Sequence, residues 1–161
     1  MLTPENVPTI FGAMIRSDQL LDTAVPVNLK NAKGCLITVI HKTGGNTDQV
    51  LTVHEGASAA VATAGTYPIT TGAEFPIWTT LIAGTSDIPI RQTNGLGFTV
   101  DADVHTGTCV VMFYIDASKL TAGRTWIAVG STGGHASSIS AVIYQLDGYR
   151  YQQASTLTAI A

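Results

Sequence analysis

The fold of this chain is decided by the apolar stretch Thr108-Cys109-Val110-Val111-Met112-Phe113-Tyr114-Ile115. β-Branched and aromatic side chains, which are common in strands, occupy both its odd and its even positions. A strand with one buried face alternates apolar with polar residues, because successive side chains point to opposite faces. The stretch therefore predicts a central strand, and we expect both of its faces to be covered.

Shorter strand-like runs lie on either side of this stretch, and Gly, Asn, Asp and Pro separate them. The predicted strands cover residues 36–40, 49–55, 77–82, 88–92, 98–102, 125–129 and 138–144. Residues 42–48 are rich in turn formers, so we expect 36–40 and 49–55 to pair as a hairpin. The alanine-rich segment 57–64 is predicted to be a loop or a sheet edge.

Short strands without strand–helix–strand alternation indicate an all-β fold, an antiparallel β-sandwich of jelly-roll-like character. We assign this single domain to residues 25–150. In residues 1–24, apolar side chains recur at near-helical spacing but Gly12 interrupts them, so we expect an N-terminal arm or a short helix. Residues 151–161 are predicted to be a polar C-terminal tail with an apolar tip.

The chain carries unusually few charges for its length. Charged residues make up 12% of the 161 residues, against about 25% in a typical soluble domain. A weakly charged surface tends to associate, because little repulsion keeps apolar patches apart. The composition therefore favours self-association or assembly over a freely diffusing monomer, although a neutral, threonine-rich sandwich is the alternative.

The same numbers argue against several partners. With a net charge of −3 and scattered Lys and Arg, the chain lacks the basic stripe that nucleic acid requires. No apolar run approaches the roughly 18 residues of a membrane span. The N-terminus has no basic region followed by an apolar one, so we expect no signal peptide and synthesis in the host cytoplasm.

Candidate metal ligands are sparse. Asp101, Asp103 and His105 alternate, and on an extended strand they would share one face and could bind a divalent cation. A polar strand end before a turn explains them better. His41 and His54 bracket the predicted hairpin, so they lie too far apart to share a metal and are expected at the surface or an interface. We predict no metal and no cofactor.

Catalytic signatures are also missing. Ser131 lies close to His135 in a loop, but the chain has no G-x-S-x-G elbow and no glycine-rich phosphate loop. Cys35 and Cys109 lie within apolar strands, which predicts buried free thiols, with a disulfide as the alternative. We therefore expect a protein that is not an enzyme.

The candidate interface residues come from the two ends of the chain. Exposed apolar and aromatic side chains, and arginine beside them, are the usual anchors of protein interfaces. Those that meet this description are Ile10, Phe11 and Met14 in the arm, and Tyr149, Arg150 and Tyr151 near the C-terminus. Trp78, Trp126 and the tyrosines could instead form a sugar-stacking platform, but Trp126 lies in an apolar strand and is expected in the core.

Two groups of segments carry a family resemblance. One is residues 27–39 with the Thr-Gly-Gly turn that follows, and the other is residues 113–120, 126–130 and 141–144. Together they resemble small structural proteins of tailed bacteriophages, which are encoded among head genes and interpreted as capsid decoration (cement) or minor head proteins. The resemblance covers roughly residues 25–150 and consists of a pattern of strands and turns.

This resemblance implies a viral structural protein on the capsid surface of the virion. The expected partners are copies of the chain itself, as a trimer, and the major capsid protein. A tail, baseplate or head-fibre component is the alternative within the same structural class. A carbohydrate-binding module is the alternative from another class.

Overall fold

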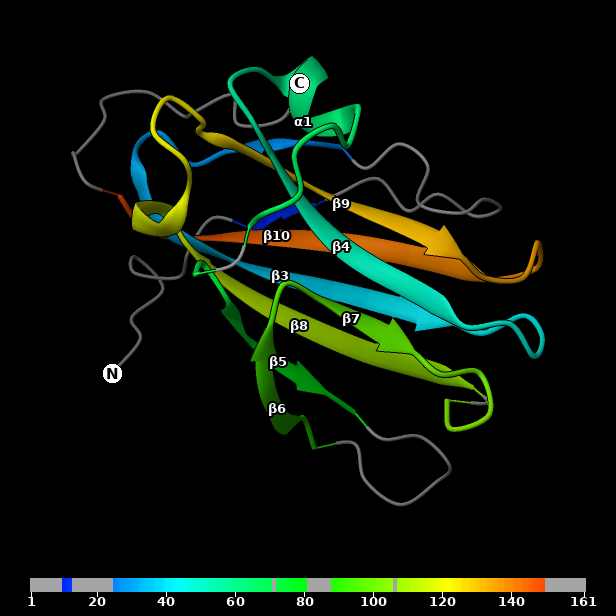
Figure 1. Ribbon diagram of the computed structural model, residues 1–161. Coiled ribbons are helices and arrows are strands. Elements are labelled where there is room, and N and C mark those ends of the chain that lie inside the picture. Colours follow the sequence, from blue (N-terminus) through cyan, green and yellow to red (C-terminus); the bar gives the residue numbers. More distant parts are fainter. Residues whose placement is uncertain (1–9, 13–24, 71, 81–87, 106, 150–161) are drawn as a thin grey trace.

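The computed structural model describes residues 10–12, 25–70, 72–80, 88–105 and 107–149. They form two antiparallel β-sheets packed face to face (Figure 1), which confirms the predicted all-β sandwich. The strands are β1 (Ile10–Gly12), β2 (Val27–Asn28), β3 (Ala32–Lys42), β4 (Gln49–Gly56), β5 (Phe75–Thr79), β6 (Ile90–Gly95), β7 (Gly97–Val100), β8 (Thr108–Asp116), β9 (Trp126–Gly133) and β10 (Ile139–Tyr149). A short helix α1 (Ala59–Thr63) and a 3-10 turn η2 (Ala117–Lys119) join them.

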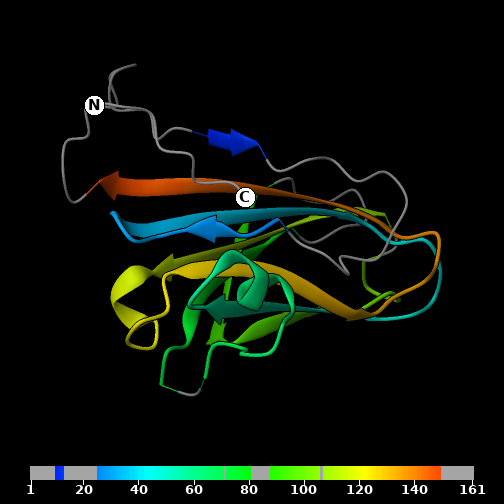
Figure 2. The ribbon, with the colours of Figure 1, turned by 90° about the horizontal axis from the view of Figure 1, so that it is seen from above.

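The strand order, which the sequence pattern does not predict, places the long apolar strands together. One sheet has six strands in the order β1-β10-β3-β8-β5-β6, and the other has four in the order β2-β9-β4-β7. The predicted central strand is β8, and it does lie inside the larger sheet, between β3 and β5. Figure 2 shows the two layers edge-on, one above the other, with β1 next to its partner β10 at the edge of the larger sheet.

The core lies between the sheets and is built from alternating positions. Residues 35, 37 and 39 of β3 and 109, 111, 113 and 115 of β8 are buried there, opposite buried residues of β4 and β9. The rings of Phe75 and Phe113 pack edge to face, 5.4 Å apart. Tyr144 joins the layers, because its buried Oη accepts a hydrogen bond of 3.1 Å from the Val129 amide in the other sheet.

The predicted hairpin of 36–40 with 49–55 is wrong. β3 belongs to the six-stranded sheet, where it pairs with β8 and β10, whereas β4 belongs to the four-stranded sheet, where it pairs with β7 and β9. The connection of residues 43–48 therefore crosses from one layer to the other. Turn residues indicate that the chain reverses, but they do not say whether the returning strand pairs or changes sheet.

The prediction of a loop or edge at 57–64 is also corrected. Residues 59–63 form α1, and the Ser58 side chain caps it by accepting a hydrogen bond from the Val61 amide. Alanine is the best helix former, and a capping serine supplies the start signal. The helix contacts β4 and β9.

Several other connections also change sheet, and one of them joins β6 in the larger sheet to β7 in the smaller one. Gly97 permits this corner, because a Cβ there would lie 2.4 Å from the Leu51 carbonyl oxygen. The described part of the predicted N-terminal arm is β1, which pairs with β10 so that Ile10 lies opposite Gln145. The arm thus contributes a strand to the sandwich.

Candidate interaction surface

The outer face of the six-stranded sheet, which points away from the core, is apolar. Its residues are those that alternate with the core positions of the central strands, and they are partly exposed. They are Leu36, Thr38 and Ile40 on β3, Val110, Met112 and Tyr114 on β8, Ala141, Ile143 and Gln145 on β10, and Trp78 on β5. None of these side chains is charged, and we refer to this set as the outer face.

The sheet register makes this face continuous. Thr38 lies between Met112 and Ile143, and Trp78 extends the same row on β5. The next row joins Ile40 to Val110 and Ala141 in the same way. Directly opposed side chains on neighbouring strands lie in contact, so these residues form one patch.

The sequence predicted that both faces of β8 would be covered, and the structure corrects this. Its core face is fully buried, but the other side is only half-buried, in an alternating pattern along the strand. Among the elements that the structure describes, only β1, at the sheet edge, lies on that side in Figure 2. The apolar residues that suggested a doubly buried strand are therefore partly accessible.

The two ends of the outer face carry opposite charges. At one end, Gly34 lies between Asp116 and Asp147 on the neighbouring strands. At the other end, Lys42 occupies the same strand as Gly34 and is exposed. Trp78 is bordered by Arg91, whose guanidinium lies 5.0 Å from the ring centre. An apolar centre with a charged rim is the usual composition of a protein interface.

Tyr114 covers Gly34 at the acidic end. Its hydroxyl donates a hydrogen bond of 2.7 Å to the Asp147 carboxylate. A Cβ on Gly34 would lie 2.8 Å from this hydroxyl, so glycine is needed for the ring to cross β3. Burial, followed by the hydrogen bond to Asp147, raises the pKa of Tyr114 to about 12, so the phenol stays protonated.

The outer side of the four-stranded sheet is different, because helix α1 covers one end of it, whereas Val50, Thr99 and Thr132 at the other end are exposed. Helix α1 packs on Gly56, where a Cβ would lie 2.5 Å from the Ala62 amide nitrogen, and Ala62 is fully buried. His54 lies over Gly130 and hydrogen-bonds to Thr52, and burial lowers the pKa of His54. A shallow groove remains beside β7, but no titratable side chain lines it.

Three of the six predicted interface residues lie in the two strands at one edge of the larger sheet. Ile10 and Phe11 lie in β1 and Tyr149 ends β10, and β1 and β10 are paired. The structure therefore brings strands from the two predicted clusters together at the edge that borders the outer face. Met14, Arg150 and Tyr151 lie outside the described residues.

The predicted surface position of His41 is wrong. The side chain is buried, since residue 41 continues the core-facing alternation of β3, and its Nδ1 lies 2.8 Å from the Ser140 hydroxyl. Burial, and then repulsion from His105, lowers the pKa of His41. His54 lies on the outer side of the other sheet, so the two imidazoles do not come together. The sequence predicted this separation.

Asp101, Asp103 and His105 form a turn and not a strand face. Asp101 accepts hydrogen bonds from the backbone amides of Asp103 and Val104, while the buried His105 ring bonds back to the Asp101 carbonyl oxygen. Within the described ranges, no group of three acidic, histidine or cysteine side chains is placed to hold a metal ion.

The hydroxyl and thiol candidates are also occupied or buried. Ser131 accepts a hydrogen bond from Gln49, and His135 accepts one from the Ser137 amide. Burial raises the pKa of Cys35 to about 12 and that of Cys109 to about 11, so neither thiol ionises readily. Their register separates them by six residue positions, about 20 Å along the strands, which confirms two free thiols.

Sequence reasoning missed one buried polar cluster. Glu55 is 1% exposed and accepts hydrogen bonds from the amide and hydroxyl of Thr121 and from Arg124, whose nitrogen lies 2.8 Å away. Arg124 in turn stacks 3.8 Å above the ring of Tyr67. Because Glu55 follows the apolar core positions Leu51 and Val53 in the alternation of β4, the carboxylate at a core position was the available signal. The cluster holds the β8–β9 connection against β4.

Comparison with known proteins adds no identification: no family model, curated protein or solved structure matches the chain. None of the helices that the structure describes has the length and apolar character required to span a membrane.

Proposed function

We propose that this chain is a structural protein of a tailed bacteriophage that decorates or cements the capsid through symmetric contacts between copies. The observation that carries the proposal is the outer face, a continuous apolar surface with a charged rim. Isolated domains rarely leave such a patch uncovered, because its exposure to water is unfavourable. On a shell, many modest contacts of this kind add up to firm attachment.

The composition supports the same role. A chain with 12% charged residues gains little from long-range electrostatic attraction, so contact area has to provide most of its binding energy. The outer face contains Trp78, Met112 and Tyr114, residue types that are enriched at interfaces. The sequence resemblance to capsid decoration and minor head proteins supplies the virion as the location.

A non-enzymatic role accompanies this proposal. Four of the side chains that could act as a base or nucleophile, His41, His105, Cys35 and Cys109, are buried. Catalytic groups need access to substrate and pKa values near the working pH, whereas the two thiols are buried and have raised pKa values.

Reconstitution on phage heads tests the proposal. The purified full-length chain is mixed with heads of the encoding phage that lack this protein, and the bound fraction is measured by co-sedimentation. We expect saturable binding at a fixed ratio to the major capsid protein. Chain that stays in the supernatant, or that binds only isolated tails or a glycan array, would contradict the proposal.

The N-terminal segment provides a second test. We propose that the edge strand β1, with Ile10 and Phe11, and Met14 shortly after it in the sequence contact an adjacent subunit. Deleting residues 1–24 should weaken attachment to heads while circular dichroism still reports a folded β-sandwich, since the described core residues all lie between 27 and 146. Full decoration of heads by the truncated protein would show that the N-terminal segment does not take part in attachment.

A further inference from the structure

We propose that the outer face of the six-stranded sheet pairs with the same face of a second copy, so that the strands of the two sheets run in opposite directions. This inference rests on the proposed function, in which the chain works by binding other proteins. It names a second copy of the chain as one of those partners. The two copies would be related by a two-fold axis that lies between the sheets and runs across the strands.

The size of the face is sufficient for a stable pair. From Gly34 to Lys42 a strand spans nine positions, or about 27 Å, and the three strands β10, β3 and β8 are together about 14 Å wide, with a short addition from β5 around Trp78. This corresponds to about 400 Å² of flat surface per copy. Side-chain relief adds to it, so the pair would bury about 1,000 Å² in total, the lower end of the range for specific interfaces.

The charges at the two ends select the orientation. A two-fold axis parallel to the strands would place Lys42 of one copy against Lys42 of the other. An axis across the strands, through the row of Thr38, instead places Lys42 over Gly34 of the second copy. There it lies between Asp116 and Asp147, the two carboxylates that flank Gly34. Opposite charges attract and like charges repel, so the second orientation is favoured.

The same arrangement places apolar residues at the centre. Thr38, Met112, Ile143 and Trp78 share one row across the sheet, so they lie along the proposed axis and face their own counterparts. Lys33, which is also at the acidic end, packs its side chain against Gly148 and alternates with the outer-face positions. Lys119 lines the same end as Asp116, but Glu74 does so too, so the carboxylates of this end outnumber its lysines.

Sedimentation equilibrium of the full-length protein over a range of concentrations tests the pairing. We expect a reversible monomer–dimer equilibrium. Thr38→Glu puts two like charges at the axis and should weaken the dimer at least tenfold, with an unchanged circular dichroism spectrum. A wild-type protein that is monomeric at all concentrations, or that forms trimers without dimers, overturns the proposal.

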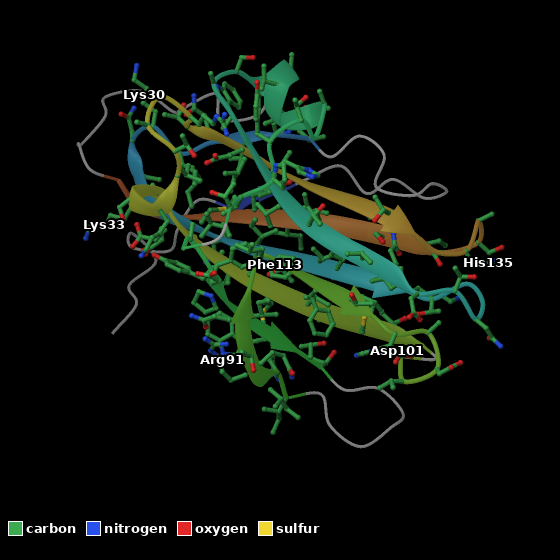
Figure 3. The ribbon with its side chains drawn as sticks, in the orientation of Figure 1. Lys30, Lys33, Arg91, Asp101, Phe113 and His135 are labelled. Atoms are coloured by element: carbon green, nitrogen blue, oxygen red, sulfur yellow. The ribbon has the colours of Figure 1, made fainter. Side chains whose placement is uncertain are left out.

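A charge exchange tests the orientation. Lys42→Glu should weaken the dimer at least about tenfold, because it places three carboxylates together. Adding Asp147→Lys to that variant should restore much of the affinity. Lys30→Glu is the matched control and should change nothing, because Lys30 is exposed in the connection between β2 and β3 and is not part of the outer face (Figure 3). If the double variant pairs no better than Lys42→Glu alone, the antiparallel orientation is wrong.

Binding to heads is measured on the same variants, so that the two proposals can fail separately. A monomer that still decorates heads contradicts the pairing and leaves the proposed function intact. A dimer that does not bind heads contradicts the proposed function and leaves the pairing intact.

Discussion

The outer side of the four-stranded sheet is covered by helix α1 at one end, whereas the outer face of the six-stranded sheet is apolar and has no helix of the described residues over it. On the smaller sheet, Gly56 and Ala128 are small enough for helix α1 to lie against the strands. On the larger sheet, side chains as large as Leu36 and Met112 project outward. The comparison teaches that similar apolar strands serve two purposes. In the four-stranded sheet they support a helix of the same chain, and in the six-stranded sheet they leave an apolar surface available for contact with other molecules.

The largest expected effect is a difference in lost stability between a core residue and an outer-face residue of β8. Phe113 is fully buried and Met112, its neighbour, points outward and is half-buried. Phe113→Ala should lower the free energy of unfolding by about 3–5 kcal/mol, through lost burial and a cavity. Met112→Ala should cost less than about 1 kcal/mol in dilute monomer. Urea denaturation measures both.

Equal losses for the two variants would mean that the outer face is as buried as the core, and the comparison would fail. Val110→Ala on the outer face and Val111→Ala in the core form a second matched pair on the same strand, and we expect the same order of effects.

The next largest effect concerns the polar cluster on the side of the four-stranded sheet. Glu55→Ala leaves the Thr121 amide and the Arg124 guanidinium without their acceptor, and should cost about 2–3 kcal/mol of stability. Glu55→Gln keeps the shape and part of the hydrogen bonding, so its loss should be smaller. A loss under about 0.5 kcal/mol for Glu55→Ala would show that the cluster is not needed to hold the β8–β9 connection.

A smaller effect is expected where α1 covers the sheet. Gly56→Ala adds a Cβ within 2.5 Å of the Ala62 backbone, so the helix must shift, at a cost of about 1–3 kcal/mol in thermal unfolding. Ala57→Val adds carbon atoms at the adjacent exposed residue and serves as the control, with little change. If both substitutions are neutral, α1 contributes little to covering this side.

The smallest effect is the dependence of stability on pH. Burial lowers the pKa of both His41 and His54 below the ordinary 6.5, so the folded protein favours the neutral imidazoles. Their contribution to stability is fully present above pH 6.5, is lost as the pH falls from there toward the lowered folded-state pKa values, and then levels off. Urea denaturation at pH 8 and pH 5 should show lower stability at pH 5, and His41→Gln should reduce that difference. An unchanged pH dependence in His41→Gln would exclude His41 as a source.

The sequence predicted the strands better than it predicted their partners. Alternation and turn residues located most of the strands, because side-chain period and backbone conformation are local properties. The hairpin failed because β3 is more favourably paired with β8 and β10, which come from distant parts of the chain. No local signal distinguishes a turn that pairs two strands from one that crosses between sheets.

The candidate surface was only partly predictable for a related reason. The apolar side chains of β8 were interpreted as buried on both faces, since an apolar residue looks the same whether its own chain or another molecule covers it. Only the sheet order shows that Met112, Thr38 and Ile143 form one row. The charges of Lys42 and Asp147 become informative only when the register places them at opposite ends of the outer face, measured along the strands.

The most direct test of the central claim is oxidative footprinting of Met112, followed by mass spectrometry of its peptide. The claim is that the outer face of the six-stranded sheet is covered in the assembled state. We predict that Met112 oxidises readily in dilute protein and is protected at concentrations where copies associate and on decorated heads. Equal oxidation rates in the dilute and assembled states would contradict the claim.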